Sequence, residues 1–170
     1  HGGPHSADGY GFDFKDQYFA ANGYFIFDTN FRSSTGYGEA FKWATWGEWG
    51  KKDGEDVVSG IDYVLKHYLI DPKRVGHTGH SYGGFMTGWL ASHAGERFRA
   101  AIVERAVTSW DSFSGSSDIG FVFAEQYTGA DPAASAAQSP LAYVDKIDLP
   151  VLIIHSEQDW RCPVEQAQRL

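Results

Sequence analysis

The apolar residues of this chain fall into short continuous runs and longer periodic stretches. Runs at 24–27, 100–103 and 149–154 are typical of strands that are covered on both faces, as in a parallel sheet. A further β-like run begins at Val75 and leads into Ser81. Because helix-like stretches alternate with these runs, the pattern predicts an α/β fold, a mostly parallel sheet flanked by helices.

The clearest predicted helix is 52–68, where apolar residues recur at three- and four-residue spacing. Its apolar positions, which we expect in the core rather than in a site, are Val57, Val58, Ile61, Val64, Leu65 and Tyr68. Asp53 can cap its start. A second helix is expected over 12–21, and a third follows Pro163. In the 12–21 helix the expected core contacts are Phe14, Tyr18 and Phe19.

Composition narrows the class of protein. With 42% hydrophobic residues among 170, the chain is globular, and its net charge of −8 argues against nucleic acid or an anionic membrane as a partner. It has no apolar run near the ~20 residues of a membrane-spanning helix. The single cysteine, Cys162, excludes an internal disulfide framework and fits a cytoplasmic location. We expect no metal or cofactor, and a homo-oligomer is left open.

The two ends of the chain suggest a piece of something longer. The sequence begins at His1 inside a motif, and it stops at Leu170 within a helix-like stretch. We therefore expect one partial domain over 1–170, with no second domain.

The main chemical signal is Gly79-His80-Ser81-Tyr82-Gly83, a Gly-x-Ser-x-Gly pattern between a predicted strand and a predicted helix. A serine on such a turn projects its hydroxyl above the sheet, and the glycines allow the backbone to turn tightly. A glycine-rich turn with an incidental serine is the simpler interpretation. The strand–turn–helix context favours Ser81 as a nucleophile.

A second signal is His1-Gly2-Gly3-Pro4. In hydrolases with the serine turn, such a segment supplies one backbone N–H of the oxyanion hole. Taken alone it is an N-terminal loop, but together with Ser81 it favours the oxyanion interpretation.

An activated serine needs a histidine base and an acid that orients it, in the chain order serine, acid, histidine. Asp159 follows the predicted 149–154 strand and is the expected acid, with Glu157 as the alternative. No histidine follows Asp159. The chain has seven, none of them a good candidate for the base: His1, His5, His67, His77, His80, His93 and His155. We expect the base beyond Leu170.

The segment 108–138 is long and mixed, and it follows a predicted strand. Loops at that position carry function in open α/β sheets, so Trp110 and Phe113 are candidates for a substrate pocket. Ordinary packing under a long loop explains these residues equally well.

Together these motifs resemble the catalytic domain of the prolyl oligopeptidase family of serine peptidases, in its acylaminoacyl-peptidase and dipeptidyl-peptidase branch. The resemblance rests on 1–4, 28–38, 79–86, 139–141 and 155–161. It implies an α/β-hydrolase fold that is incomplete here. A strand preceding His1 would lie between the 24–27 and Val75 runs, and a β-propeller would precede the domain.

The resemblance also implies roles. Ser81 would be the nucleophile, Asp159 the acid, and the backbone N–H groups of Gly3 and Tyr82 the oxyanion hole. Arg161 would hold a substrate carbonyl. The substrate would be a short or N-acylated peptide. A carboxylesterase using the same machinery remains an alternative, as does a catalytically incomplete fragment or binding scaffold.

Overall fold

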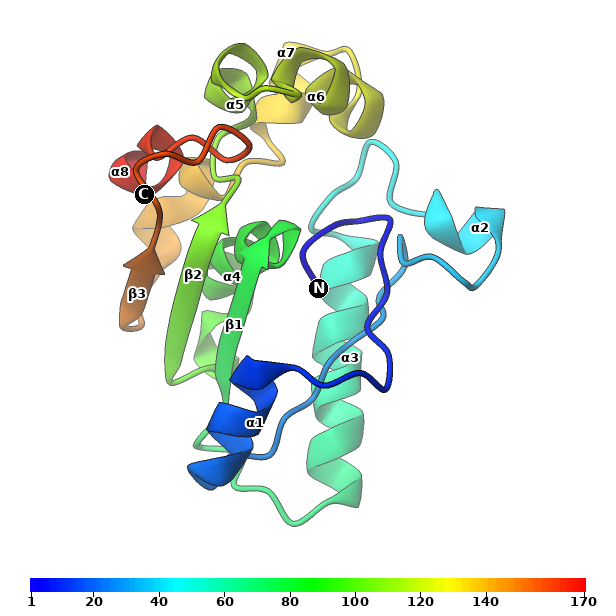
Figure 1. Ribbon diagram of the computed structural model, residues 1–170, viewed down its shortest axis with the longest axis vertical. Helices are drawn as coiled ribbons and strands as arrows, with labels where there is room; N and C mark the ends of the chain where they lie inside the picture. The colour runs from blue at the N-terminus through cyan, green and yellow to red at the C-terminus, as the bar shows by residue number, and fades with distance from the viewer.

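The computed structural model describes residues 1–170 and is built on a parallel sheet of three strands in the order β1-β2-β3 (Figure 1). The strands are β1 (Gly76–Ser81), β2 (Ala100–Ala106) and β3 (Val151–Ile154). Gly79 is aligned with Val103, and Ile102 with Leu152. Three of the four predicted strands are therefore confirmed, as is the α/β class with a parallel sheet.

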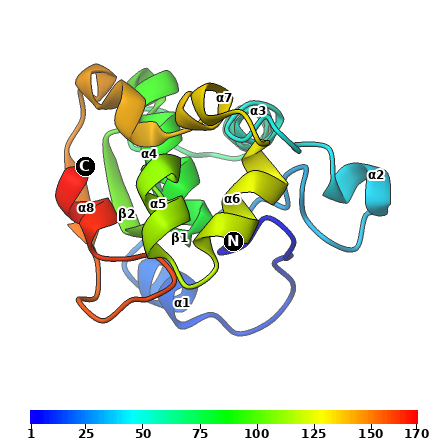
Figure 2. The same ribbon diagram turned by 90° about the horizontal axis from the view of Figure 1, so that it is seen from above.

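Helices surround this sheet. In chain order they are α1 (Phe14–Ala21), α2 (Glu39–Lys42), α3 (Lys52–His67), α4 (Tyr82–His93), α5 (Trp110–Ser116), α6 (Gly120–Thr128), α7 (Pro132–Ala136) and α8 (Glu165–Arg169), with two 3₁₀ helices, η1 (Gly95–Arg97) and η2 (Pro140–Lys146). Helix α4 packs against β1 and β2, whereas α5, α6 and α7 gather beyond the carboxyl ends of those strands (Figures 1 and 2). No helix is long and apolar enough to cross a membrane.

The segment 108–138 is not the long loop that we predicted. It forms α5, α6 and α7, each nine residues or shorter. Helices of this length show little periodicity, and their stability comes from tertiary packing rather than from propensity. The Asp131 side chain caps α7 by accepting a hydrogen bond from the Ala133 N–H at 3.0 Å, with Pro132 in the first turn.

The core is an aromatic cluster between α4 and the helices around it. Trp49, Phe85, Trp110 and Phe113 are almost wholly buried. Trp49 meets Trp110 edge-to-face, with ring centroids 4.9 Å apart. Such edge-to-face pairs add about 0.5–1.5 kcal/mol beyond the area that they bury. The cluster adjoins the turn that carries Ser81, because the ring of the next residue, Tyr82, packs against Trp49 and Phe85.

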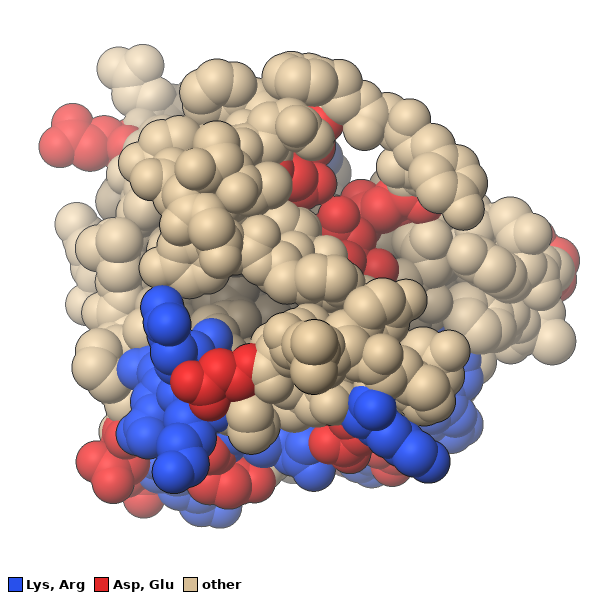
Figure 3. All heavy atoms as spheres, turned by 90° about the horizontal axis from the view of Figure 1, so that it is seen from below, with Lys and Arg blue, Asp and Glu red and all other residues tan.

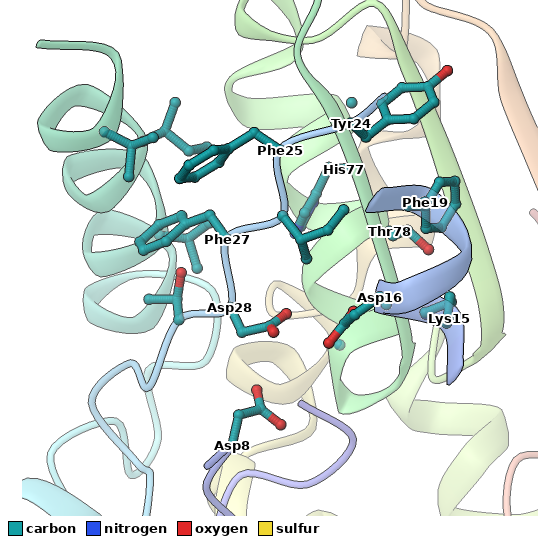
Figure 4. A pocket seen from close by; sticks show the side chains of 18 of the residues that line it. Asp8, Lys15, Asp16, Phe19, Tyr24, Phe25, Phe27, Asp28, His77 and Thr78 are labelled. Carbon is teal, nitrogen blue, oxygen red and sulfur yellow. The ribbon is translucent and has the colours of Figure 1, made fainter. Parts of the chain in front are cut away.

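The predicted strand at 24–27 is absent, and its side chains are half-exposed. A cavity of about 800 Å³ separates this segment from β1, whose outer edge has no strand partner. Phe27 lies against Gly60 of α3, and Figure 4 shows Phe25 and Phe27 turned toward that helix. The gap expected between the 24–27 and Val75 runs is therefore present. Without a neighbouring strand the apolar run cannot form a ladder.

Three details of the predicted helices are wrong. Phe14 and Tyr18 of α1 are 75% and 58% exposed, and no residue of α1 is fully buried. Tyr68, the last apolar position expected in α3, is also exposed. Asp53 does not occupy the cap position. It lies inside the first turn of α3, is fully buried, and accepts a hydrogen bond from the Gly50 N–H at 3.1 Å.

Charged residues mix on the end of the molecule opposite α5, α6 and α7. Figure 3 shows Lys and Arg side chains along one margin of this face with Asp and Glu side chains between them.

Around the mouth of the large cavity, Asp16 and Asp28 lie close together (Figure 4). The pKa of Asp28 is raised to about 6, mainly by burial and to a smaller extent by the negative charges of Asp16 and Asp8.

Candidate active site

Ser81 lies on a sharp turn between β1 and α4, as the sequence predicts. Its backbone has φ 55° and ψ −115°, a left-handed conformation that is rare for any residue but glycine. The β1–β2 register shifts between His80 and Ser81. Such strain persists only where the surroundings enforce it, and it is typical of functional sites.

The turn at Ser81 requires glycine at neighbouring positions, because the adjacent backbone leaves no room for a side chain there. A Cβ at Gly79 would lie 2.5 Å from the Gly83 backbone, and one at Gly84 would lie 2.6 Å from the Glu104 carbonyl oxygen. α4 can therefore pack directly on the strand ends. The helix begins at Tyr82, so its first N–H groups lie beside Ser81.

A cavity of about 160 Å³ lies beside Ser81. Its lining is mostly apolar: Gly2, Gly3, Pro4, Trp49, Ser81, Tyr82, Val107, Phe113, Ile119, Phe123, Arg161 and Cys162. The Ser81 Oγ lies 3.9 Å from the Cys162 Sγ. Burial raises the pKa of the Cys162 thiol to about 11. The thiol therefore stays protonated at neutral pH and does not compete with Ser81 as a nucleophile.

The predicted oxyanion segment crosses the start of α4. Gly3 and Tyr82 both line the cavity, and the Tyr82 N–H donates a long hydrogen bond of 3.4 Å to the Gly2 carbonyl. Gly2 itself packs against the His80 ring, since a Cβ there would lie 2.3 Å from Nε2. The structure thus brings Gly3 and Tyr82 to the side of the cavity where Ser81 lies.

Asp159 lies in the loop after β3, at the carboxyl ends of the strands, where Ser81 follows β1. Its Oδ1 accepts hydrogen bonds from the N–H groups of Arg161 at 3.0 Å and Cys162 at 2.8 Å. Its Oδ2 has no partner within the chain. Glu157, the alternative acid, is exposed and makes no side-chain hydrogen bond. The structure therefore holds Asp159 in place and leaves one carboxylate oxygen available to a further donor.

Arg161 lies on the rim of the cavity and is paired with Asp118. Its Nε and Nη2 donate to the two carboxylate oxygens of Asp118 at 2.7 and 3.1 Å, which leaves Nη1 without a partner. The Ser117 hydroxyl donates to the Arg161 carbonyl at 2.6 Å. Hydrogen bonding to Arg161 lowers the pKa of Asp118. Sequence reasoning missed Asp118, since its segment has no pattern that points to Arg161.

The two predicted pocket residues, Phe113 and Trp110, occupy different environments in the structure. Phe113 lines the cavity, whereas Trp110 is fully buried in the core and does not. The Trp110 Nε1–H donates to the Gln138 carbonyl at 3.2 Å. The prediction that Trp110 lines a substrate pocket is therefore wrong, because its ring fills space behind the pocket wall. Trp49, Val107, Ile119 and Phe123 line the cavity and were not predicted.

No histidine of the chain bonds to Ser81. His80 lines the large cavity rather than the one beside Ser81. The His155 Nε2 bonds to the Cys162 carbonyl at 2.6 Å, and His93 stacks on Trp89 with ring centroids 3.9 Å apart. No three His, Cys, Asp or Glu side chains lie close enough together to hold a metal ion.

Comparisons with known proteins agree with this geometry. A profile of the prolyl oligopeptidase family matches residues 10–170. YuxL of Bacillus subtilis, described as an uncharacterized peptidase, is 43% identical over 175 residues, which are 100% of this chain and 26% of the relative. The uncomplexed acylaminoacyl peptidase of Pyrococcus horikoshii is 37% identical with a TM-score of 0.95, over 99% of this chain and 28% of the other.

A structure of an acylaminoacyl peptidase in complex with Z-Gly-Gly-Phe-chloromethyl ketone is 36% identical, with a TM-score of 0.94 over 99% of this chain and 28% of the other. The chain thus spans about a quarter of the length of these relatives, 26% and 28% of the two named above. The fold is that part of an α/β-hydrolase fold which carries the serine turn. The chain belongs to the prolyl oligopeptidase family.

Proposed function

We propose that the protein containing this chain is a serine peptidase that cleaves short or N-acylated peptides through an acyl-enzyme on Ser81. The observation that carries the proposal is the strained turn of Ser81 at the edge of an apolar cavity. Gly3, Tyr82 and Arg161 line the same cavity, and the Nη1 of Arg161 has no hydrogen-bond partner within the chain.

In the first step, Ser81 Oγ attacks the substrate carbonyl while its proton passes to a histidine outside this chain. The N–H groups of Gly3 and Tyr82 stabilise the negative charge that forms on the carbonyl oxygen. Removing one such donor typically costs about 10²–10³ in kcat. Asp159 orients the histidine through its free Oδ2. The leaving amine takes the proton, and water then releases the acyl group by the reverse sequence.

The cavity indicates the substrate's side chain. Its walls are formed by Val107, Phe113, Ile119 and Phe123, so it suits an apolar side chain next to the cleaved bond. The inhibitor of the acylaminoacyl peptidase complex carries phenylalanine beside its chloromethyl ketone. Arg161 is the one charged group on the lining, and its Nη1 is available to a substrate carbonyl.

The test is turnover of an N-acyl-phenylalanine anilide by the full-length protein and by its Ser81→Ala variant. We expect Ser81→Ala to lower kcat by about 10⁶-fold, the loss typical of a removed nucleophile. Ser59→Ala is the control, because Ser59 is exposed on α3 and bonds only within its own helix. Normal turnover by Ser81→Ala would refute the proposal. Turnover of a nitrophenyl ester with no turnover of the anilide would favour a carboxylesterase.

We further propose a cytoplasmic location. The support is Cys162, which is free and buried beside Ser81 and needs no oxidising compartment. Fractionation of cells that express the full-length protein tests this proposal, and recovery of the protein from the extracellular medium would contradict it.

A further inference from the structure

A buried carboxylate that does not line the cavity bonds to Tyr82, the residue that follows Ser81. Asp53 is fully buried in the first turn of α3. Its Oδ2 accepts hydrogen bonds from the Tyr82 hydroxyl and from the Gly50 N–H at 3.1 Å. Its Oδ1 accepts one from the Gly54 N–H at 3.1 Å. No lysine or arginine bonds to this carboxylate.

A buried carboxylate that is not paired with a cation destabilises the folded state unless hydrogen bonds replace its lost hydration. Burial raises the pKa of Asp53 to about 6, against the opposing effect of its hydrogen bond with Tyr82. The amino end of α3 offsets part of the remaining cost. The hydrogen bond to Tyr82 is the one contact that links this carboxylate to the candidate active site.

Tyr82 is held at both ends. Its backbone N–H follows Ser81 directly, and its hydroxyl is fixed by Asp53 on another helix. Between these ends the ring packs against Phe31 at 5.2 Å and Trp49 at 4.5 Å between centroids. Packing alone allows an aromatic ring to slide within its plane, whereas a hydrogen bond at the far end fixes its distance from α3.

The orientation of the Tyr82 N–H is only weakly fixed by its own hydrogen bond. In this structure it donates to the Gly2 carbonyl at 3.4 Å, close to the limit for a hydrogen bond. A small rotation of the Tyr82 peptide therefore decides whether the N–H is directed at Gly2 or at an oxyanion beside Ser81. The left-handed backbone of Ser81 makes that peptide dependent on restraint from outside the turn.

We propose that Asp53 is a positioning residue which, through the Tyr82 hydroxyl, holds the Tyr82 peptide N–H in the orientation that stabilises the oxyanion formed at Ser81. The inference rests on the proposed function, since it presupposes acyl transfer at Ser81. It adds Asp53 to the site, although this side chain never touches the substrate.

The experiment compares Tyr82→Phe, Asp53→Asn and the double variant in the full-length protein. Tyr82→Phe removes only the hydroxyl. Asp53→Asn turns one acceptor oxygen into an amide NH₂ group, and where this group takes the place of Oδ2 the Tyr82 O–H and the Gly50 N–H both lose their acceptor. Tyr143→Phe is the matched control, because its hydroxyl donates to the Ala137 carbonyl at 3.0 Å, away from the cavity.

We expect Tyr82→Phe and Asp53→Asn each to lower kcat about tenfold and to leave KM within about twofold, because a displaced oxyanion donor weakens transition-state binding alone. An N-acyl-phenylalanine aldehyde, which forms a tetrahedral adduct on Ser81, should bind about tenfold more weakly to both variants. The double variant should be no worse than Tyr82→Phe, since both changes break the same hydrogen bond. Tyr143→Phe should resemble the wild type.

A purely structural role would lower the Tm of both variants and leave kcat and aldehyde affinity unchanged, and this result would overturn the inference. A double variant whose loss is the product of the two single losses would also overturn it. If Asp53→Asn does not fold, Tyr82→Phe decides alone. Full activity of Ser81→Ala would instead refute the proposed function, so the two failures are distinguishable.

Discussion

Gly79→Ala perturbs the serine turn without touching a candidate catalytic group. The added Cβ would lie 2.5 Å from the carbonyl carbon and oxygen of Gly83, whereas ordinary contact begins at about 3.4 Å. Backbone must therefore move by roughly 0.9 Å, the difference between these distances. Because the contact is with the first turn of α4, that movement is transmitted to Ser81 and to the Tyr82 N–H. A misplacement of about 1 Å costs about 10²-fold in rate, or roughly 2.7 kcal/mol.

The assay is kcat/KM of the full-length protein on the acyl-phenylalanine anilide, together with its Tm. Gly115→Ala is the control, since a Cβ there meets nothing within 4 Å and Gly115 also lies in a helix. We expect Gly79→Ala to lose about 10²-fold in kcat/KM and Gly115→Ala to lose less than about twofold. If Gly79→Ala kept activity within twofold of the wild type, the argument that close packing holds the serine turn would be refuted.

Three further predictions follow from the site. The 170-residue chain alone should turn over the anilide at least about 10³-fold more slowly than the full-length protein, since no histidine contacts Ser81; turnover by this chain that Ser81→Ala abolishes would contradict it. Arg161→Lys should raise KM about tenfold for an acyl-dipeptide anilide but not for a nitrophenyl ester, because only the dipeptide offers the extra carbonyl to Nη1; equal effects on both would argue against that contact. Iodoacetamide should label Cys162 about 100-fold more slowly at pH 7.5 than a thiol with the ordinary pKa of 9.0, and the rate should rise tenfold per pH unit toward its pKa of about 11; fast labelling at pH 7.5, read by peptide mapping, would show that the thiol is not buried.

The parts of the fold that the sequence predicts are those whose cause is local. The 52–68 periodicity, the Gly-x-Ser-x-Gly turn and the 149–154 run carry their own spacing, breakers and small residues. They form α3 (Lys52–His67), the turn of Ser81 and β3 (Val151–Ile154). The failures at 24–27 and in α1 have one common cause. An apolar pattern shows that a segment tends to be buried, but it does not supply the neighbour that buries it.

The candidate site likewise has parts that the local sequence predicts and parts that depend on residues distant in the sequence. Ser81, Gly3 and Asp159 belong to motifs that are contiguous in sequence. The structure places Ser81 and Gly3 on one cavity and Asp159 in the loop at the carboxyl end of β3. Asp118 and Asp53 reach the site only through Arg161 and Tyr82, at separations of 43 and 29 residues. No local pattern encodes such a pairing. Trp110 was misplaced for the same reason, since its burial depends on Trp49 and on Gln138.

Cavity size would have led to the wrong site in this molecule. The largest well-formed pocket is the usual first hypothesis for a binding site, yet the cavity of about 800 Å³ is not lined by Ser81. It lies along the unpaired edge of β1, where main-chain N–H and C=O groups lack a neighbouring strand. The cavity of about 160 Å³ is smaller but is bordered by a strained serine, two candidate N–H donors and a positioned guanidinium. Convergent polar groups in an apolar cavity, rather than volume, therefore identify the candidate active site.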